Sequence, residues 1–343
     1  MAIRVSQYTR DGGDWDAFVR EQPRWTHFHL HGWRAVLERV FGHECIYLEA
    51  REPGGALVGV LPLVRVRSLL FGHYLVSMPF VNYGGPLGTP AGISALVDET
   101  TRLAARDRVR LLELRSREPL PTELAVSHRK ITALLDLPGS AEELWRSLPA
   151  KVRSQIRRPQ KEGIEIRMGP DQLDAFYGVF ARHMRDLGTP AQSFEFFQTI
   201  ADQFPRDLRV ACAYFEGQPI ACGCGFIWGS EFEITWASAL RAFKHLSANM
   251  LVYWTLMEAA IADGAHVFNF GRCTPGSGTH RFKAQWGARD EALWWYQRSA
   301  DSDPRASTPS PEHGQYVLAT RIWSRLPLSI TTRLGPSIVR CIP

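Results

Sequence analysis

The sequence predicts a mixed α/β protein made of two similar halves. Two hairpin turns, at Gly55 and Gly217, lie 162 positions apart, and two strands that each follow a helix, at Leu112 and Phe268, lie 156 positions apart. The same elements thus recur in the same order at nearly the same spacing, which indicates a duplicated domain. A dinucleotide-binding fold is disfavoured because no Gly-x-Gly-x-x-Gly follows a first strand.

The composition is that of a protein with a sizeable apolar core and a mild positive charge. The chain has 343 residues, of which 45% are hydrophobic and 22% charged, and its net charge is +5. This charge is compatible with a polyanionic partner but does not require one. The N-terminal sequence lacks the apolar region of a signal peptide, and the six cysteines have neither disulfide-scaffold density nor zinc-site spacing. We therefore expect a cytoplasmic protein without a metal site.

The first half, residues 1–138, is expected to form one domain. Its predicted elements, in chain order, are helices over 14–20 and 33–41, hairpin strands over 43–50 and 56–66, a strand over 74–77, a helix over 93–105 and a strand over 110–114. The loop over 78–86 is rich in Gly and Pro but keeps Asn82 and Tyr83. Such a loop is more often a pocket wall than a linker, so both are candidate substrate-binding residues.

The second half, residues 139–300, repeats this order. Its predicted elements are amphipathic helices over 171–187 and 193–204, hairpin strands over 208–215 and 220–228, a strand over 232–237, a helix over 248–262 and a strand from Val267. Glu233 lies on the strand after the hairpin and is the candidate general base. An exposed strand carboxylate without a catalytic role is the alternative.

A basic helix over 149–161 opens the second half. It carries Lys151, Arg153, Arg157, Arg158 and Lys161 on one side and apolar residues on the other, with no acid before Glu162. Pro159 is expected to end or kink it near Arg158. A solvated helix face is one interpretation. The other is a phosphate-binding stripe, in which Arg153 and Arg157 contact the substrate.

The stretch from Val267 to Gly287 is the strongest candidate for a functional site. It begins as a strand, breaks at Gly271 into a Gly-rich loop, and continues with Thr279 and Lys283. Phe282 and Trp286, four positions apart, suit one helical turn that faces the core and leaves Lys283 turned toward the loop. Arg272 and Lys283 at the end of a buried strand suit a phosphate-bearing ligand, although an ordinary loop with solvated bases fits the composition as well.

The composition changes after Ser299. Residues 301–314 are rich in Ser, Pro and Asp and are predicted to be a linker. Residues 315–343 form a basic amphipathic tail with four arginines, no acid and interleaved apolar residues. The tail fits a peripheral contact with the inner membrane, a contact with another protein, or a cover over the domain's own apolar surface.

Three motifs together resemble the FemAB family of aminoacyl transferases, over about residues 15–295. They are the basic helix with Lys161-Glu-Gly, the segment from Phe176-Tyr177 through Arg185-Asp186 to Phe196-Phe197, and Phe270-Gly271 followed by Gly278-Thr279, Phe282-Lys283 and Trp286-Gly287. The resemblance implies two tandem GNAT-like (acyl-CoA N-acyltransferase-like) domains with a cleft between them. Tyr83-Gly-Gly and Phe270-Gly-Arg272 are similar to the branch that accompanies PEP-CTERM/exosortase and exopolysaccharide loci.

The resemblance also implies an activity and roles for residues. The activity is transfer of an aminoacyl or acyl group to a glycan or peptide amine in cell-envelope or exopolysaccharide biosynthesis. The donor substrate is aminoacyl-tRNA or acyl-CoA, and no cofactor is bound permanently. Lys283 and Glu233 are assigned to catalysis. Arg185, Arg272, Thr279 and Lys283 are assigned to a phosphate or carboxylate of the substrate.

Three other functions compete with this one. An acyl-CoA-dependent enzyme acting on an amino sugar or lipid-linked glycan would cradle the CoA pyrophosphate in the loop over 241–248, although that loop lacks the usual Gly-x-Gly. An enzyme with a cysteine nucleophile would use Cys273 with His280, but the sequence shows no third group to orient them. A non-catalytic adaptor would bind glycan or nucleic acid through the basic helix.

Overall fold

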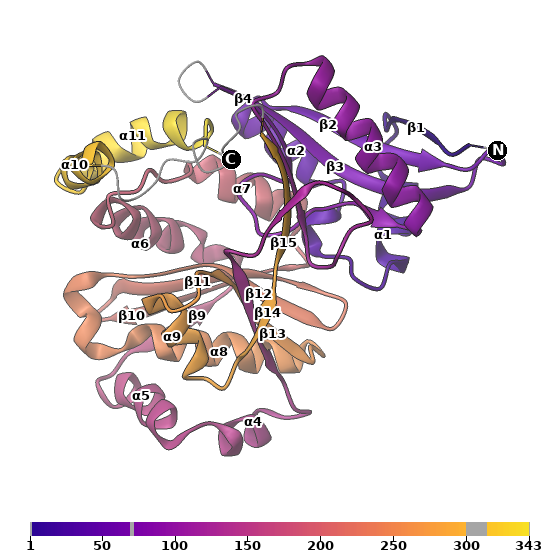
Figure 1. The fold of residues 1–343 in the computed structure, drawn as a ribbon. Coiled ribbons are helices and arrows are strands. Elements are labelled where there is room, and N and C mark those ends of the chain that lie inside the picture. Colours follow the sequence, from indigo (N-terminus) through magenta and orange to yellow (C-terminus); the bar gives the residue numbers. More distant parts are fainter. Residues whose placement is uncertain (1, 69–71, 300–313, 343) are drawn as a thin grey trace. The chain divides into compact units, whose positions relative to one another are not determined.

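The structure is a computed structural model that describes residues 2–68, 72–299 and 314–342 (Figure 1). The described residues form two compact units. The first unit takes its residues from Met1–Arg129, Ala292–Pro311 and Val339–Pro343, and the second takes its residues from Lys130–Glu291 and Glu312–Ile338.

The first unit is built on a mixed sheet in the order β1-β2-β3-β4-β6-β15-β7, with β5 paired to β3. The strands are β1 (Arg4–Gln7), β2 (Glu44–Arg51), β3 (Leu57–Ser68), β4 (Gly72–Ser77), β5 (Leu87–Gly88), β6 (Leu111–Ser116), β7 (Ala125–Ser127) and β15 (Trp294–Ser299). The helices are α1 (Gly13–Glu21), the 3-10 turn η1 (His27–His29), α2 (Trp33–Phe41) and α3 (Pro90–Arg106). The helix α3 starts three residues earlier than predicted because Thr89 caps it and Pro90 suits its first position.

The second unit is built on a mixed sheet in the order β14-β8-β13-β12-β11-β10-β9. The strands are β8 (Ile131–Asp136), β9 (Glu165–Met168), β10 (Leu208–Phe215), β11 (Gln218–Trp228), β12 (Glu231–Ala239), β13 (Val267–Cys273) and β14 (Arg289–Ala292). The helices and 3-10 turns are α4 (Ala141–Ser147), α5 (Ala150–Lys161), η2 (Pro170–Gln172), α6 (Leu173–Asp186), α7 (Phe194–Gln203), η3 (Arg241–Leu246), α8 (Ala248–Ala262), α9 (Gly278–Ala284), α10 (Gly314–Trp323) and α11 (Leu328–Val339).

The two sheets have the same topology. Four antiparallel neighbours, β1 to β4 in one unit and β9 to β12 in the other, lead to a parallel pair, β4/β6 or β12/β13. A helix connects the strands of each parallel pair, α3 in the first unit and α8 in the second. The prediction of a mixed α/β protein with two tandem domains is therefore confirmed. The cleft expected between the domains stays a prediction.

Each predicted domain contributes one strand to the sheet of the other unit. The predicted boundaries after residues 138 and 300 do not allow for this exchange. The strand β8, within the predicted first domain, pairs with β13 of the second sheet, for example Leu135 opposite Phe268. The strand β15, within the predicted second domain, pairs with β6 of the first sheet, for example Trp295 opposite Arg115. A strand's own residues set its face and length but not its distant partner, so this exchange is not readable locally. Residues 301–313 of the predicted linker lie outside the described residues.

Alternating side chains build a core on each face of the first sheet. On one face, Leu48 of β2 packs into a cluster with Leu96 of α3. On the other face, Tyr47 stacks on Trp15 of α1 with ring centroids 5.1 Å apart. This alternation is the period of two that a strand imposes.

The second sheet carries helices on both faces, with α6 on one side and α8 on the other (Figure 1). The helix α8 is apolar on nearly every side, and nine of its 15 residues are buried. The helix α5 packs on α8 through Val152 and Ile156 and continues through the buried Pro159 to Lys161. Pro159 was predicted to end or kink α5 near Arg158, and it does not end it there, because the missing N–H of a proline in the last turn removes only one helical hydrogen bond.

Candidate functional site

The central feature of the second unit is the point where β12 and β13 part. Their parallel pairing consists of Glu231 with Val267, Phe232 with Phe268 and Glu233 with Asn269. Beyond these pairs β12 continues to Ala239 and β13 to Cys273 without pairing to each other. The edge of β12 after Glu233 therefore presents backbone N–H and C=O groups that β13 does not take up.

A β-bulge lies next to this point. Cys224 of β11 is opposite Trp236 and Gly225 is opposite Ile234, so Thr235 is an extra residue on β12. A side chain at position 225 would not fit, because a Cβ there would lie 2.1 Å from the backbone oxygen of Glu233. A bulge bends its strand and redirects the backbone, so it helps to turn β12 away from β13.

A pocket of about 580 Å³ lies where the strands have parted. Its walls come from two residues of β11, the end of β12, η3, the beginning of α8, two residues of α6, and single residues of α5 and α9. Apolar side chains such as Phe243, Tyr253 and Phe282 form much of the lining. Polar groups converge on the same space: Gln155, His183, Asp186, Ser238, Arg241, Lys244, Asn249 and Gln285. An apolar pocket with a few convergent polar groups is the usual form of a ligand site.

The entrance of α8 gives this pocket a positive end. Ser247 begins the helix in the left-handed region, with φ of 56°, and its side chain makes no capping hydrogen bond. The first turn of α8 contains no acid, and the exposed Arg241 and Lys244 of the preceding η3 line the pocket. A helix N-terminus flanked by cations attracts phosphate groups.

His183 is a basic group in the pocket that the sequence analysis did not select. It lies near the end of α6, and its Nδ1 atom is buried without a hydrogen-bond partner. Burial lowers the pKa of His183 below its usual range, while Asp186 acts in the opposite direction. The imidazole is therefore neutral at pH 7 and able to accept a proton. The residues around His183 do not indicate a functional role, because only the packing of α6 against the sheet brings this side chain to the pocket.

Lys283 turns toward the loop that begins at Gly271, as predicted, but it is buried there. Its side chain is 6% exposed, and Nζ donates to the backbone oxygens of Gly271 at 2.7 Å and Arg272 at 2.8 Å. Burial lowers the pKa of Lys283 to about 8, while Cys273 and Glu233 act in the opposite direction. The ammonium therefore links α9 by hydrogen bonds to the end of β13. The pairing of β13 with β8 is irregular there, and Gly271 has φ of 71°.

The apolar part of the same prediction agrees with the structure. Trp286 is 1% exposed and belongs to the core of the second unit, and Phe282 packs against Tyr253 with ring centroids 5.0 Å apart. Both rings thus face the core as the spacing predicts. Lys283 follows them inward because the carbonyls at the bulge offer it partners.

Glu233 is fully buried, so the alternative of an exposed strand carboxylate is excluded. It belongs to a network centred on Asn269, whose Nδ2 donates to Glu231 Oε1 at 2.7 Å and to Glu233 Oε2 at 3.3 Å. Asn269 Oδ1 accepts from Thr132 Oγ1 at 2.7 Å and from the backbone N–H of Gly271 at 2.8 Å. The network fixes the backbone where the two strands part. The one feature of the sequence that could have indicated this network is the polar Asn269 between Phe268 and Phe270 on a buried strand.

The remaining predicted residues of the second unit lie near its surface. Arg272 and Thr279 are exposed at the end of β13 and on α9. Arg185 pairs with Asp186, Nη2 to Oδ1 at 2.6 Å, and only Asp186 lines the large pocket. Arg185 thus has the structural ion pair that competes with a binding role.

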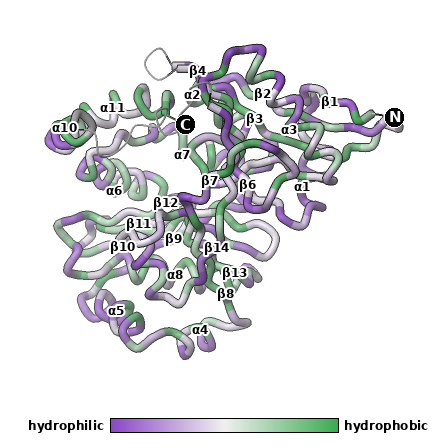
Figure 2. Tube along the Cα trace, in the orientation of Figure 1, coloured by the Kyte–Doolittle hydropathy of each residue, from purple (hydrophilic) through white to green (hydrophobic). Residues whose placement is uncertain are grey.

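The basic helix α5 has one structural arginine and a strip of exposed ones. Arg153 Nη1 donates to the carbonyl oxygens of Leu148 at 2.7 Å and Arg146 at 3.2 Å, at the end of α4. Arg157 lies over the ring of Trp145, with 5.0 Å from the guanidinium carbon to the centroid. Arg153, Arg157, Arg158 and Lys161 line a groove of about 430 Å³, and α5 is drawn mostly as hydrophilic in Figure 2.

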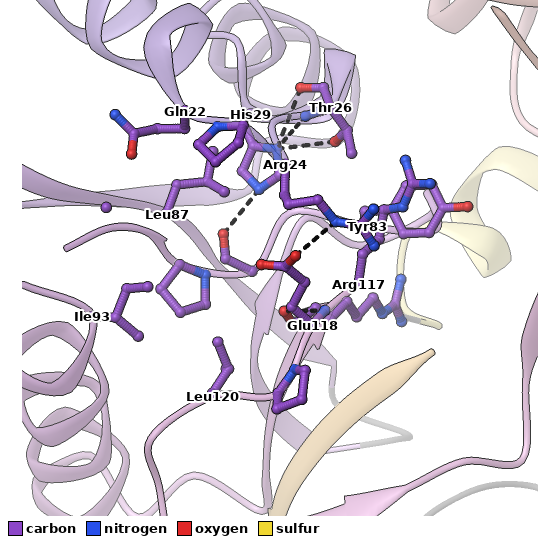
Figure 3. A pocket seen from close by; sticks show the side chains of 17 residues that line it. Gln22, Arg24, Thr26, His29, Tyr83, Leu87, Ile93, Arg117, Glu118 and Leu120 are labelled. Atoms are coloured by element: carbon purple, nitrogen blue, oxygen red, sulfur yellow. Dashed lines mark hydrogen bonds and ion pairs between the residues drawn. The ribbon is translucent and has the colours of Figure 1, made fainter. Parts of the chain in front are cut away.

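Asn82 and Tyr83 belong to the first unit and are both buried. Tyr83 lines a small pocket of about 90 Å³, whereas Asn82 is not part of its lining. In this pocket Arg24 faces Glu118, with 2.8 Å from Nε to Oε1, and Arg117 lies over the ring of Tyr83 (Figure 3). Its volume suits a few water molecules or one small polar group.

The chemistry of Cys273 does not favour a cysteine nucleophile. Cys273 is 5% exposed, and burial raises the pKa of its thiol, although Lys283 acts in the opposite direction. The structure does supply an orienting partner for His280, whose Nε2 lies 3.0 Å from Asp290 Oδ2. A buried, protonated thiol remains a poor nucleophile. In the described part of the chain, no three His, Cys, Asp or Glu side chains are grouped to hold a metal.

Comparisons with known proteins agree on the kind of domain. A family model described as an acetyltransferase (GNAT) domain matches residues 146–284. A curated relative, the UDP-N-acetylmuramoylpentapeptide-lysine N(6)-alanyltransferase of Weissella viridescens, is 26% identical over 126 residues. That match covers 36% of this chain and only 37% of the relative's length.

Solved structures show the same fold. The crystal structure of FemX is similar with a TM-score of 0.63 and 13% identity, covering 85% of this chain and 97% of that one. The L-PGS of Bacillus licheniformis is similar with a TM-score of 0.58 and 16% identity, covering 92% of this chain and 98% of that one. The matched acetyltransferase domain and the likeness to an alanyltransferase support an acyltransferase.

Proposed function

We propose that this chain is an N-acyltransferase that carries an acyl or aminoacyl group from a phosphate-bearing donor to an amine. The observation that supports it best is the pocket at the parting of β12 and β13, with the α8 N-terminus, Arg241 and Lys244 at one end. A donor with its phosphates at that end could lay its acyl carbonyl along the edge of β12. Aminoacyl-tRNA and a CoA thioester both meet this description.

The chemistry needs alignment, an oxyanion site and one proton acceptor. Backbone N–H groups of β12 after Glu233 can stabilise the oxyanion as the amine adds to the carbonyl. We assign the amine proton to His183, which is neutral and open to the pocket. The bond from the carbonyl to the donor then breaks, and the leaving thiolate or alkoxide takes up a proton.

We propose that activity depends most on Lys283. It fixes the end of β13 at the opposite side of the parting from β12. Glu233 acts beside it by orienting Asn269 and by balancing its charge. We assign Arg272 and Thr279, exposed at the same strand end, to a phosphate or carboxylate of the substrates, and the exposed bases of α5 to a longer phosphate-bearing donor.

The acceptor we propose is a glycan or peptide amine of the cell envelope. The curated relative is named for alanyl transfer to the lysine of a UDP-linked muramoyl pentapeptide, which favours this class. The sequence motifs favour exopolysaccharide biosynthesis within it. The enzyme would then work in the cytoplasm, next to the inner membrane where such acceptors are assembled.

One observation favours acyl-CoA as the donor. The lining by η3 and the first turn of α8 gives a compact positive end, which suits a pyrophosphate better than a long nucleic-acid strand. The absence of a Gly-x-Gly in residues 241–248 counts against tight binding. Donor choice is therefore the first question for experiment.

The test is calorimetric titration of the full chain with acetyl-CoA and, separately, with an alanylated RNA minihelix. At least one donor should bind, and Arg241→Glu with Lys244→Glu should weaken it by about ten- to a hundredfold, as expected for lost charge-assisted contacts. Arg67→Glu with Arg102→Glu, exposed arginines of the first unit, should leave the affinity unchanged. Equal binding by both double variants, or no binding of either donor, would contradict the proposed site.

A further inference from the structure

The tail helices α10 and α11 are held on the second unit by small residues. A Cβ at Gly188 would lie 2.5 Å from the backbone oxygen of Thr320 in α10. A Cβ at Gly335 in α11 would lie 2.9 Å from the backbone oxygen of Ala191. Thr331 and Gly335 are accordingly buried. One side of the helix pair is thus fixed against the segment between α6 and α7 by close backbone contact.

The other side of the pair exposes apolar side chains. Of the seven large hydrophobic side chains that are strongly exposed in the described part of the chain, five lie on these two helices. They are Val317 (45%), Leu318 (57%), Ile322 (54%), Ile330 (40%) and Leu334 (49%). Both helices also show hydrophobic and hydrophilic positions close together in Figure 2. Such a concentration on one surface marks an interaction site; we call it the tail face.

Arginines are interleaved with these apolar residues. Arg321 is exposed on α10, Arg325 is exposed in the turn that follows this helix, and Arg333 is exposed on α11. In α10, positions 318, 321 and 322 follow the helical repeat and share one side. Positions 330, 333 and 334 do the same in α11. No Asp or Glu occurs after Glu312, so no acid of the tail offsets the arginines.

We propose that the tail face docks on an anionic phospholipid bilayer. Apolar side chains flanked by arginines can enter the boundary between headgroups and acyl chains while the guanidinium groups remain at the phosphates. A second copy of this chain is the less suitable occupant, because a symmetric contact would bring arginines against arginines. None of the described helices is long and apolar enough to cross a membrane.

This inference specifies the inner-membrane location given in the proposed function, but it does not depend on acyl transfer. The tail face lies on α10 and α11, and the donor pocket takes none of its lining from these helices. Vesicle binding and turnover can therefore fail independently, and each failure points to its own cause.

The experiment is sedimentation of the full chain with vesicles of phosphatidylcholine, with and without phosphatidylglycerol. We expect binding only to the anionic vesicles, weakening as salt rises. Arg321→Glu with Arg333→Glu should lower the partition coefficient at least about 25-fold, since each basic residue contributes about fivefold near an anionic surface. Leu318→Ser with Ile330→Ser should lower it at least about tenfold through lost apolar burial.

Two matched controls keep the outcome specific. Arg67→Glu with Arg102→Glu removes exposed charge from the first unit, and Val126→Ser removes its exposed apolar side chain. Both should bind vesicles like the wild type, and all variants should keep the wild-type melting temperature. Binding to neutral vesicles as strong as to anionic ones, or no vesicle binding, would overturn the proposal. So would self-association without vesicles that the tail variants abolish, because the tail face would then be an interface between copies.

Discussion

Replacing Lys283 by methionine should change how the stability of the protein depends on pH. Methionine keeps the apolar stem but removes the buried ammonium. In the folded protein, burial lowers the pKa of Lys283 from 10.5 to about 8. Between these values the unfolded chain binds more protons than the native one, so the wild type gains stability relative to the variant as the pH rises.

The size of this gain follows from the pKa difference. Each pKa unit corresponds to about 1.4 kcal/mol, so the free energy of unfolding of the wild type should rise by about 2–3 kcal/mol relative to Lys283→Met between pH 7 and pH 10. Other groups titrate alike in both proteins and cancel in the difference. Cys273 and Glu233 are exceptions because they interact with Lys283, so both proteins should carry Cys273→Ser and Glu233→Gln.

The assay is urea unfolding followed by tryptophan fluorescence at several pH values from 7 to 10. Lys161→Met, an exposed lysine on α5, is the control and should give a difference that does not change with pH. A flat difference for Lys283→Met would refute the reasoning, because it would place the ammonium in solvent, which is the alternative interpretation of this stretch. Turnover of Lys283→Ala should still fall at least about tenfold once a substrate is known.

The remaining predictions concern the bulge, the basic helix and the pocket. Gly225→Ala should lower the free energy of unfolding by at least about 2 kcal/mol because its Cβ would meet the oxygen of Glu233. Gly178→Ala on α6 has open space around it and should raise the free energy of unfolding by about 0.5–1 kcal/mol. Urea unfolding measures both changes. Arg153→Glu should lower the free energy of unfolding by about 1–3 kcal/mol because it leaves carbonyls at the end of α4 without a donor. Arg158 is exposed, so Arg158→Glu should change the free energy of unfolding by less than about 0.5 kcal/mol. The kcat/KM of the wild type should fall as the pH drops through the lowered pKa of His183. His183→Gln should have a lower kcat/KM that does not show this fall. If the pH profile of His183→Gln matches that of the wild type, His183 is not the base.

The sequence is enough to predict the fold because its signals are periodic and repeated. The apolar run of β2, the cap and proline that open α3, and the recurring hairpin turns all act locally. The exchange of β8 and β15 between sheets is not predictable in this way. It depends on which of two similar sheets a strand joins, and the residues of the strand do not encode that choice.

The site was predictable only as a region. The stretch from Val267 to Gly287 does lie at the parting of the strands, and its two rings pack as expected. Lys283 does turn toward the loop at Gly271, but its burial was not predicted, because it depends on carbonyls that a bulge exposes to a cation. His183 and Ser238 were missed because they come to the same pocket only through the packing of α6 against β12. Arg153 looked like a ligand residue, although it also caps a neighbouring helix.

The most direct test of the central claim is amide hydrogen exchange of the full chain with and without donor, read by mass spectrometry. If the acyl donor lies where β12 and β13 part, saturating acetyl-CoA or alanylated minihelix should slow exchange in peptides that cover residues 234–250. Peptides from the small pocket of the first unit, such as residues 83–88, should be unaffected. Slower exchange confined to peptides outside the second-unit pocket would contradict the claim.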